Sequence, residues 1–373
     1  MKRVLITGGA GFIGSHVTER LLESGWDVRV LDCLEPQVHG DDGSALPPHV
    51  LAAVDFRRAD LRDRQQVESA VQGMDAVIHL AAAVGVGQSM YEICRYTSMN
   101  ASATAVLGEA LIAHPVERLV VASSMSVYGE GLYRAAGGRD HESVRRSAAS
   151  LDAHEWDPCN PDGEPLEPVP TPEWKRPDLS SIYALTKYHQ EQQVLILGRA
   201  YGMQATALRL FNVYGPRQSL SNPYTGVLAI FASRLLAGKA PVIFEDGQQC
   251  RDFVSVYDVA EAFRLTLENP PPGRVINIGS GERYSVLGVA KTLREALGTN
   301  DVPIDISGKY RVGDIRHCFA DISLAGQLLG YRPRVRFADG LREYVGWLSA
   351  SGVRGEDRVE VMRAELAARG LAR

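Results

Sequence analysis

Short apolar runs recur through the first two thirds of the chain. They cover residues 4–7, 28–32, 56–60, 76–81, 119–124 and 206–211. Most of the runs are separated by stretches of helical length, in which apolar side chains recur at four-residue spacing, as at Ile13, Val17 and Leu21. Strands that alternate with helices predict a parallel sheet with helices on both faces, and such sheets bind their ligands at the carboxyl ends of the strands.

Two regions depart from this pattern. Residues 130–178 have no sustained helical or strand period and contain seven prolines. This predicts an irregular surface insertion, which is either a partly ordered excursion or a lid over a substrate. After Phe211 the pattern loosens into loops and short elements, and it ends in a charged tail with Val359, Met362 and Leu366 at helical spacing.

The length and composition fit two fused globular units. The chain has 373 residues, of which 45% are hydrophobic, enough for one large core or two fused ones. We therefore expect an α/β protein with a doubly wound parallel sheet of the Rossmann type in residues 1–211, interrupted by the insertion. Residues 212–373 are expected to build mainly a smaller α/β substrate-binding domain, and residues 250–268 to return to the first domain.

The charge and the cysteines argue against several classes of protein. A formal net charge of −5 gives no broad basic surface, which disfavours nucleic acid and anionic membranes as partners. The five cysteines are scattered without C-x-x-C spacing, so neither a disulfide framework nor a metal site is expected. The chain also lacks an apolar run of about 18 residues, the length that a membrane-spanning helix requires. We expect a soluble, cytoplasmic protein.

A glycine-rich turn follows the first predicted strand. Gly8, Gly11 and Gly14 have the spacing G-x-x-G-x-x-G and lead into an amphipathic helix. Such glycines allow a tight turn and let backbone N–H groups approach a pyrophosphate, so the segment predicts a dinucleotide site. Asp32 ends the second strand, where a carboxylate accepts hydrogen bonds from the adenosine ribose and repels a 2′-phosphate, which selects NAD. Asp60 closes the third strand and is a candidate for the adenine amino group or a simple turn residue.

A tyrosine and a lysine supply candidate chemistry. Tyr183 and Lys187 lie four residues apart in a predicted helix, so both side chains leave the same face. We expect the ammonium group to lower the pKa of Tyr183 from about 10 toward the range of a general base. Ser123 and Ser124 end a predicted strand, and Ser124 is the better candidate for the hydroxyl that holds a substrate oxygen, since it lies where a side chain can face the crevice.

Together these motifs resemble the NDP-sugar epimerase/dehydratase family, which is of the extended short-chain dehydrogenase/reductase type. The resemblance runs from about Arg3 to Trp347 and includes the strand end at 79–82 and the segment 208–212. It implies that Asn212, Arg251 and Arg316 hold the diphosphate of a sugar nucleotide. Two guanidinium groups can bind a diphosphate bidentately, although each arginine alone is more typical of a surface ion pair. Phe244 resembles the position that packs on the nucleobase, and a place in the apolar core is an equal alternative.

These arguments predict three sets of site residues and no metal ligands. The catalytic residues are Ser124, Tyr183 and Lys187. The cofactor site comprises Gly8, Gly11, Phe12, Ile13, Gly14, Asp32, Asp60, Leu61, Leu80, Ala81, Ala82, Asn100, Ser123, Tyr183, Lys187 and Phe211. The substrate site comprises Ser124, Asn212, Phe244, Arg251 and Arg316.

The two residues after Ser124 select among the reactions of this family. Dehydratases that resemble this chain carry Asp-Glu, and decarboxylases carry a Glu, where this chain has Met125 and Ser126. Neither side chain acts as a carboxylate acid or base, which favours an NAD-dependent NDP-sugar 4-epimerase: oxidation at C4, rotation of the 4-keto intermediate and reduction on the other face. The alternatives are a 4,6-dehydratase, a UDP-glucuronate decarboxylase or dehydrogenase, and a non-catalytic NAD-binding sensor or scaffold, which does not need all three catalytic residues.

Within the family, the chain most resembles bacterial dTDP-L-rhamnose 4-epimerase-like NDP-sugar 4-epimerases. The segments that carry this resemblance are the insertion, residues 221–226 and residues 313–317. The expected substrate is dTDP-L-rhamnose or a related dTDP- or UDP-hexose, while the residues leave the nucleobase and the sugar open. The resemblance also implies a homodimer that pairs through the segments near 102–113 and 182–201.

Overall fold

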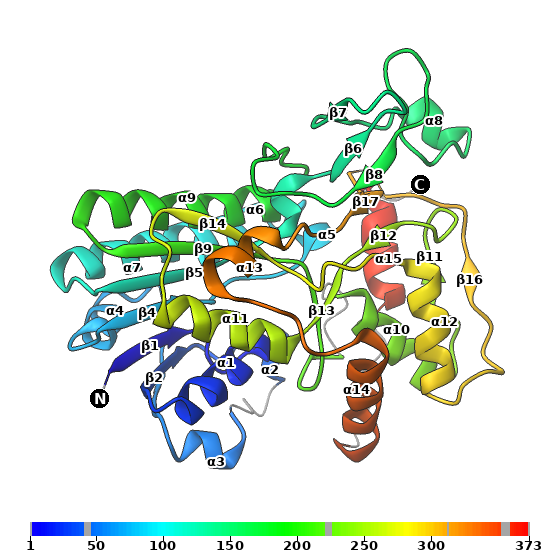
Figure 1. Cartoon of the computed structure of the whole chain (residues 1–373). Coiled ribbons are helices and arrows are strands. Elements are labelled where there is room, and N and C mark those ends of the chain that lie inside the picture. Colours follow the sequence, from blue (N-terminus) through cyan, green and yellow to red (C-terminus); the bar gives the residue numbers. More distant parts are fainter. Residues whose placement is uncertain (1, 41–45, 221–225, 312, 352–358, 372–373) are drawn as a thin grey trace.

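The computed structural model describes residues 2–40, 46–220, 226–311, 313–351 and 359–371. A seven-stranded parallel sheet forms the centre of the larger part (Figure 1). Its strand order is β14-β9-β5-β4-β1-β2-β3. The strands are β1 (Arg3–Thr7), β2 (Asp27–Asp32), β3 (Asp55–Arg58), β4 (Ala76–His79), β5 (Arg118–Ser124), β9 (Gln204–Leu210) and β14 (Arg274–Ile278).

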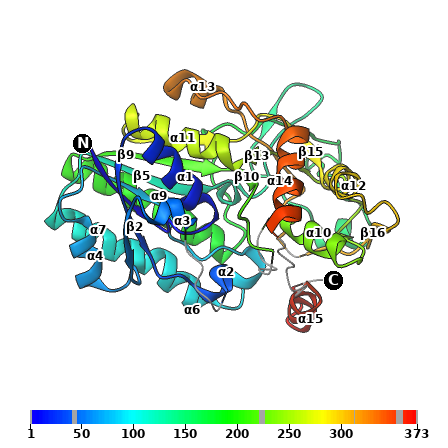
Figure 2. The same ribbon diagram turned by 90° about the horizontal axis from the view of Figure 1, so that it is seen from below.

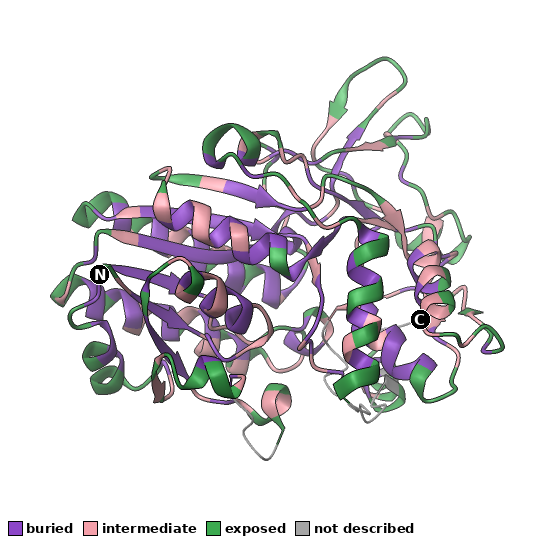
Figure 3. Cartoon of the chain, turned by 60° about the horizontal axis from the view of Figure 1, so that its bottom comes forward, coloured by how far each residue is buried: buried purple, intermediate pink, exposed green. Residues whose placement is uncertain are grey.

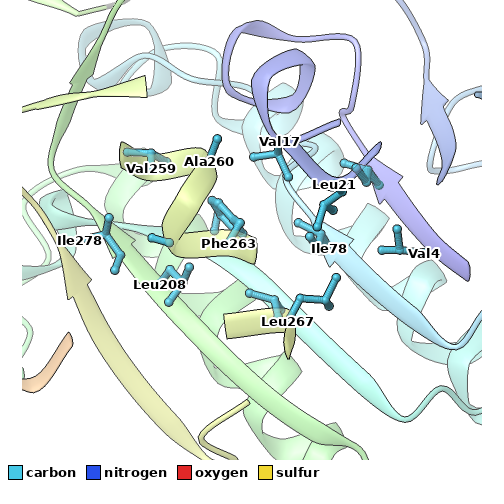
Figure 4. Close-up of a cluster of buried hydrophobic side chains, with 14 of the residues drawn as sticks. Val4, Val17, Leu21, Ile78, Leu208, Val259, Ala260, Phe263, Leu267 and Ile278 are labelled. Carbon is cyan, nitrogen blue, oxygen red and sulfur yellow. The ribbon is translucent and has the colours of Figure 1, made fainter. Parts of the chain in front are cut away.

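Helices cover both faces of the sheet, because the inner strands are apolar on both sides. Val4 and Ile6 of β1 face one core cluster and Leu5 faces the other. Helices α1 (Phe12–Glu23) and α11 (Val256–Glu268) cover the first face, and Figure 4 shows their side chains meeting those of the strands. The second face is covered by α4 (Arg64–Val71), α7 (Ala103–Ala113) and α9 (Ile182–Tyr201). The predicted doubly wound fold is confirmed, and Figure 3 shows the buried sheet at its centre.

The six apolar runs correspond to six of the seven strands, with ends that differ by one or two residues. The sequence pattern missed β14, whose short run Val275, Ile276 and Ile278 follows a proline-rich turn. Because α11 packs on α1 and β14 pairs with β9, the chain returns to the sheet domain over a longer segment than residues 250–268. The domain boundary at residue 211 stays a prediction.

The second part has its own apolar core. Helices α10 (Val227–Leu236), α12 (Val286–Ala296) and α14 (Phe337–Ser351) enclose it. Three small sheets complete this part. They pair β10 (Asn212–Tyr214) with β13 (Phe253–Ser255), β11 (Val242–Ile243) with β16 (Asp305–Ile306), and β12 (Cys250–Arg251) with both β15 (Tyr284–Ser285) and β17 (His317–Cys318).

The insertion at 130–178 is ordered and projects beyond the sheet (Figure 1). It consists of β6 (Leu132–Arg134), β7 (Asp140–His141), α8 (Ala148–Asp152) and β8 (Glu167–Val169), with the three strands in one antiparallel sheet. Tyr133, Val144 and Leu166 form a small core of its own. Strands of two or three residues are too short to give a sequence period, which explains why the pattern predicted an irregular region.

Short helices and one terminal helix complete the described chain. The short ones are α2 (Pro36–His39), α3 (Pro48–Leu51), α5 (Val86–Ser89), α6 (Ile93–Tyr96), the π-helix η1 (Thr97–Ser102), the 3-10 helix η2 (Met125–Tyr128) and α13 (Ser323–Leu329). Helix α15 (Val359–Ala368) is the last helix of the described residues and lies where the sequence predicted a helix.

Candidate active site

A first cavity of about 380 Å³ opens at the carboxyl ends of the sheet strands. Its size is in the range of small-molecule and cofactor sites. Nearly all of the predicted cofactor residues line it: Gly8, Gly11, Phe12, Ile13, Gly14, Asp32, Asp60, Leu61, Leu80, Ala81, Ala82, Ser123, Tyr183, Lys187 and Phe211.

The glycine turn at this cavity has no room for side chains. Gly8 has φ +71°, and a Cβ atom there would lie 2.7 Å from the backbone nitrogen of Ala81. A Cβ atom on Gly14 would lie 2.1 Å from the carbonyl oxygen of Gly8. Gly11 begins α1 without a side-chain cap, so the first N–H groups of the helix face an anion site rather than a capping oxygen. This cradle fits the pyrophosphate of NAD.

Two carboxylates, Asp32 and Asp60, line the first cavity. Asp32 accepts hydrogen bonds from the backbone nitrogens of Ala10 (3.0 Å) and Leu34 (2.9 Å), which fix it at the end of β2. Asp60 is paired with Arg62 at 2.6 Å, and this partner holds the pKa of Asp60 below its usual range. A carboxylate fixed in this way suits a ribose diol and repels a phosphate, so the geometry fits NAD rather than NADP.

Ser124 and Tyr183 meet in the site. Their side chains are hydrogen-bonded, and the Ser124 hydroxyl also accepts from the hydroxyl of Ser126 at 2.9 Å. Ser123 has another partner, since its hydroxyl donates to the buried Glu191 at 2.6 Å. Glu191 in turn accepts two hydrogen bonds from Arg209, at 2.7 and 2.9 Å. Ser124 is therefore the serine of this pair whose hydroxyl is turned to the Tyr183 side of the site.

The pKa of Tyr183 is shifted in the direction opposite to the predicted one, and Lys187 is not a cause of the shift. Burial raises the pKa of Tyr183 to about 12, and only the hydrogen bond with Ser124 works against this rise. Burial also lowers the pKa of Lys187 to about 7, so the ammonium group that was expected to stabilise the phenolate is itself disfavoured. The lysine Nζ atom donates to the side-chain oxygen of Gln190 at 2.6 Å.

Gln190 connects Lys187 to a buried polar network that the sequence analysis missed. Its Nε2 atom lies 2.8 Å from the Thr104 hydroxyl and 3.0 Å from His79 Nε2. Burial lowers the pKa of His79 to about 3, so this histidine is neutral at physiological pH. The predicted cofactor residue Asn100 is fully buried beside this network and lies behind the cavity wall. Its amide bonds the backbone of Ala83 at 2.7 and 3.1 Å, which holds the loop after β4.

A second cavity of about 350 Å³ adjoins the first. The two share Ser124, Tyr183, Phe211 and Asn212 in their linings. The predicted substrate residues Asn212, Phe244 and Arg251 line the second cavity, as do Met125 and Ser126. Of the three predicted catalytic residues, Ser124 and Tyr183 thus lie where the two cavities meet, and Lys187 lines only the first.

Arg316, predicted to bind the diphosphate, lines neither cavity. Its guanidinium group is fully buried and pairs with Asp157 (2.8 Å), Glu245 (3.0 Å) and Asp246 (2.6 Å). A cation already neutralised by three carboxylates has little attraction left for a phosphate. Arg311 lines the second cavity instead, with its guanidinium 4.7 Å from the centre of the Phe244 ring.

The insertion contacts the loops around the second cavity but does not line either cavity. Residues 130–178, all of which the structure describes, contribute no side chain to the lining of either cavity. Arg146 of the insertion donates to Glu245 at 2.7 Å and to the carbonyl oxygen of Asp314 at 2.8 Å. The insertion therefore braces the loops that carry Phe244 and Arg311, and the lid hypothesis gains no support.

Two negative findings apply to the described residues. They include no helix that is both long and apolar enough to cross a membrane. Nor do they bring three or more histidine, cysteine or acidic side chains together in an arrangement suited to a metal ion. Residues 221–225, which carry part of the resemblance to the 4-epimerases, lie outside the described chain.

Comparisons with known proteins agree with this geometry. A model of the NAD dependent epimerase/dehydratase family matches residues 4–279. A dTDP-L-rhamnose 4-epimerase of Burkholderia thailandensis is 35% identical over 93% of this chain and 95% of that relative. A dTDP-glucose 4,6-dehydratase of an Actinoplanes species is 29% identical over 94% of this chain and 98% of that relative. The structure of the Thermus thermophilus UDP-glucose 4-epimerase in complex with NAD superposes with a TM-score of 0.72 at 32% identity and covers 94% of this chain and 99% of that chain.

Proposed function

Since the chain belongs to the NAD dependent epimerase/dehydratase family, we propose that it is an NAD-dependent NDP-sugar 4-epimerase. It inverts the C4 hydroxyl group of dTDP-L-rhamnose or of a related dTDP- or UDP-hexose. The observation that carries this proposal is the position of Ser124 and Tyr183 in the linings of both cavities. A cofactor in the first cavity and a sugar nucleotide in the second meet at these two side chains.

Tyr183 is the proton carrier in the proposed reaction. In its phenolate form, which the positive charges of a bound nicotinamide ring and of Lys187 would favour against burial, Tyr183 takes the proton of the sugar's C4 hydroxyl group and returns it at the end of the cycle. Ser124 holds the C4 oxygen and stabilises the Tyr183 phenolate, and the Ser126 hydroxyl orients Ser124. NAD, when bound, supplies the oxidation at C4 and the reduction that reverses it. Lys187, which follows Tyr183 by one turn in α9, binds the nicotinamide ribose.

Met125 and Ser126 support epimerisation over elimination. Both line the second cavity beside Ser124, where a dehydratase needs a carboxylate pair to move protons at C5 and C6. The thioether of Met125 carries no exchangeable proton, and the hydroxyl of Ser126 is donated to Ser124. These side chains leave the C4 chemistry of Tyr183 intact and give no acid or base for the dehydratase step.

We assign the substrate's diphosphate to Arg251 and Arg311. Arg251 is oriented by the carbonyl oxygens of Cys250 and Arg316, each at 2.9 Å. Arg311 is oriented by Asp314, at 2.8 Å. Both guanidinium groups line the second cavity together with Asn212, and a pair of fixed guanidinium groups suits a diphosphate. The stacking of Arg311 on Phe244 makes that ring a platform for the nucleobase.

The proposal includes a cytoplasmic homodimer. Helices α7 and α9 lie side by side and expose Ile112, Leu185, Ile196 and Tyr201, which supports pairing through these two helices. All five cysteines are free, as expected for a reducing compartment. A monomer in light scattering at micromolar concentration would contradict the dimer.

A panel of sugar nucleotides tests the function. Purified protein is incubated with dTDP-L-rhamnose, other dTDP-hexoses and the matching UDP-hexoses, and the products are resolved by chromatography. We expect a C4-inverted product from at least one substrate without added NAD, because an epimerase regenerates its bound cofactor in each turnover. Substrates that all return unchanged would argue for the non-catalytic sensor or scaffold instead.

A further inference from the structure

Helix α15 bridges the two parts of the molecule. Its buried side chains Met362 and Leu366 pack against Tyr91, which follows α5 in the sheet domain, and against Ile230 of α10 in the substrate-binding part. Figure 2 shows α15 at the edge of the molecule, close to α10. The helix closes one side of the junction between the two parts.

Polar contacts fix α15 to both parts. The Tyr91 hydroxyl donates to Glu365 at 2.7 Å, and the guanidinium group of Arg369 lies 4.2 Å from the centre of the Tyr91 ring. At the other end, Glu360 pairs at 2.8 Å with Arg234 of α10, whose side chain is only 7% exposed. Contacts at both ends hold the helix in one orientation toward the second cavity.

The inner face of α15, together with Leu371 just after the helix, forms a wall of the second cavity. Met362 and Leu366 of α15 and the following Leu371 belong to the lining of this cavity. Leu366 approaches α5 so closely that a Cβ atom on Gly87 would lie 3.4 Å from it. The next residue but one, Ser89, accepts a hydrogen bond from the backbone nitrogen of Tyr183 at 3.0 Å. The wall therefore stands beside the segment that holds the first turn of the catalytic helix.

This wall is apolar, in contrast to the part of the cavity that holds Arg251 and Arg311. Its neighbours in the lining are Val86, Met90 and Ile230. A methyl group or the apolar face of a ring gains free energy against such a surface. A carboxylate that faced it would lose its water without gaining a cation.

We propose that α15 is a sugar-contacting wall of the substrate site and selects substrates whose sugar presents a methyl group, as in a 6-deoxyhexose, over those that present a carboxylate. The inference rests on the proposed function in one respect, since it takes the second cavity as the site of the nucleotide-linked sugar. Met362, Leu366 and Leu371 are specificity residues in this assignment. The chemical steps at C4 remain with Ser124 and Tyr183.

Leu366→Asn, with Val361→Asn as its control, tests the wall. Val361 lies on the same helix but is 61% exposed, so its replacement leaves the wall unchanged. Affinities of the NAD-loaded variants are measured by calorimetry for UDP-6-deoxyglucose and UDP-glucuronate, which differ only at C6. The wild type and Val361→Asn should bind the deoxy sugar at least about 10-fold more tightly, and Leu366→Asn should reduce this ratio to within about 3-fold. Affinity for UDP alone should stay the same in all three proteins.

Equal affinity of the wild type for the two sugars, or an unchanged ratio in Leu366→Asn, would overturn the proposal. If Leu366→Asn melts at a lower temperature than the wild type or loses NAD, Tyr91→Phe is tested in its place. This variant removes the hydroxyl group that binds Glu365 of α15 and leaves the cavity lining unchanged. It should reduce the ratio of the two affinities in the same direction. These readouts need no turnover. A protein that binds the deoxy sugar selectively but forms no product would contradict the epimerase proposal and leave the role of α15 standing.

Discussion

Replacing Gly8 with alanine puts a methyl group inside the turn that connects β1 to α1. The left-handed conformation at φ +71° costs a residue with a Cβ atom about 1–2 kcal/mol. The new atom would also lie 2.7 Å from the nitrogen and 2.8 Å from the Cα atom of Ala81. Carbon contacts are favourable at about 3.5–4.0 Å, so the turn and the end of β4 must separate by about 1 Å. Both segments line the first cavity, and NAD affinity should fall at least about 10-fold, or about 1.4 kcal/mol.

Gly25→Ala is the control for Gly8→Ala, because it introduces the same backbone strain without pushing neighbouring atoms apart. Gly25 has φ +79°, and no described atom lies within 4 Å of the position of a Cβ atom there. The variant should lose about 1–2 kcal/mol of stability, the strain that Gly8→Ala also bears, and keep its NAD. The assay measures the NAD released per protomer by denaturation and the melting temperature of each variant. A Gly8→Ala protein that keeps NAD at the wild-type level would refute the placement of the pyrophosphate, as would a Gly25→Ala protein that loses as much.

Three further predictions concern the catalytic side chain, the insertion and acid stability. Tyr183→Phe should keep NAD bound but lower the initial rate at least about 10²-fold, and a rate within a few-fold of wild type would remove the tyrosine from the mechanism. Arg146→Met removes one of the two arginines that pair with the buried Glu245. It should raise KM for the sugar nucleotide about 10-fold with a smaller change in kcat. An unchanged KM would show that the insertion does not brace the loops that carry Phe244 and Arg311. Burial lowers the pKa of His16 to about 4 and that of His79 to about 3, so the unfolded chain takes up these protons first, and the free energy of unfolding should fall as the pH drops below about 6.5, by up to about 1.4 kcal/mol per pH unit for each group. Urea titrations from pH 7.5 to 5 check this, and His16→Asn should show a shallower loss.

The parts of the fold and site that depend on local chemistry could be predicted from the sequence. The turn at Gly8, Gly11 and Gly14 can be identified because its spacing, the preceding strand and the following helix all lie within a few residues. Tyr183 and Lys187 share a helix face for the same reason. β14 was missed because its short apolar run follows a proline-rich turn, and its place in the sheet depends on pairing with the distant strand β9.

Long-range packing decided the remaining features. The sequence analysis named Arg316 as a diphosphate ligand and did not consider Arg311; only the three carboxylates around Arg316 in the folded chain show why it is unsuited. The raised pKa of Tyr183 follows from its burial in the folded chain, which residue spacing does not reveal. The contact of α15 with the second cavity joins segments that lie far apart in the chain. Arg311 lies two residues before the segment 313–317, which entered the sequence analysis only as part of the resemblance to the 4-epimerases.

The fate of the hydrogen on the sugar's C4 atom tests the proposed epimerisation most directly. Substrate deuterated at C4 should keep its label in the C4-inverted product, and the reaction in D₂O should add no deuterium at C5 or C6. These results follow from oxidation and reduction at one carbon without elimination. A 4-keto-6-deoxy sugar with solvent deuterium at C6 would contradict the epimerase and identify a dehydratase. Stoichiometric NADH without an inverted product would identify a dehydrogenase.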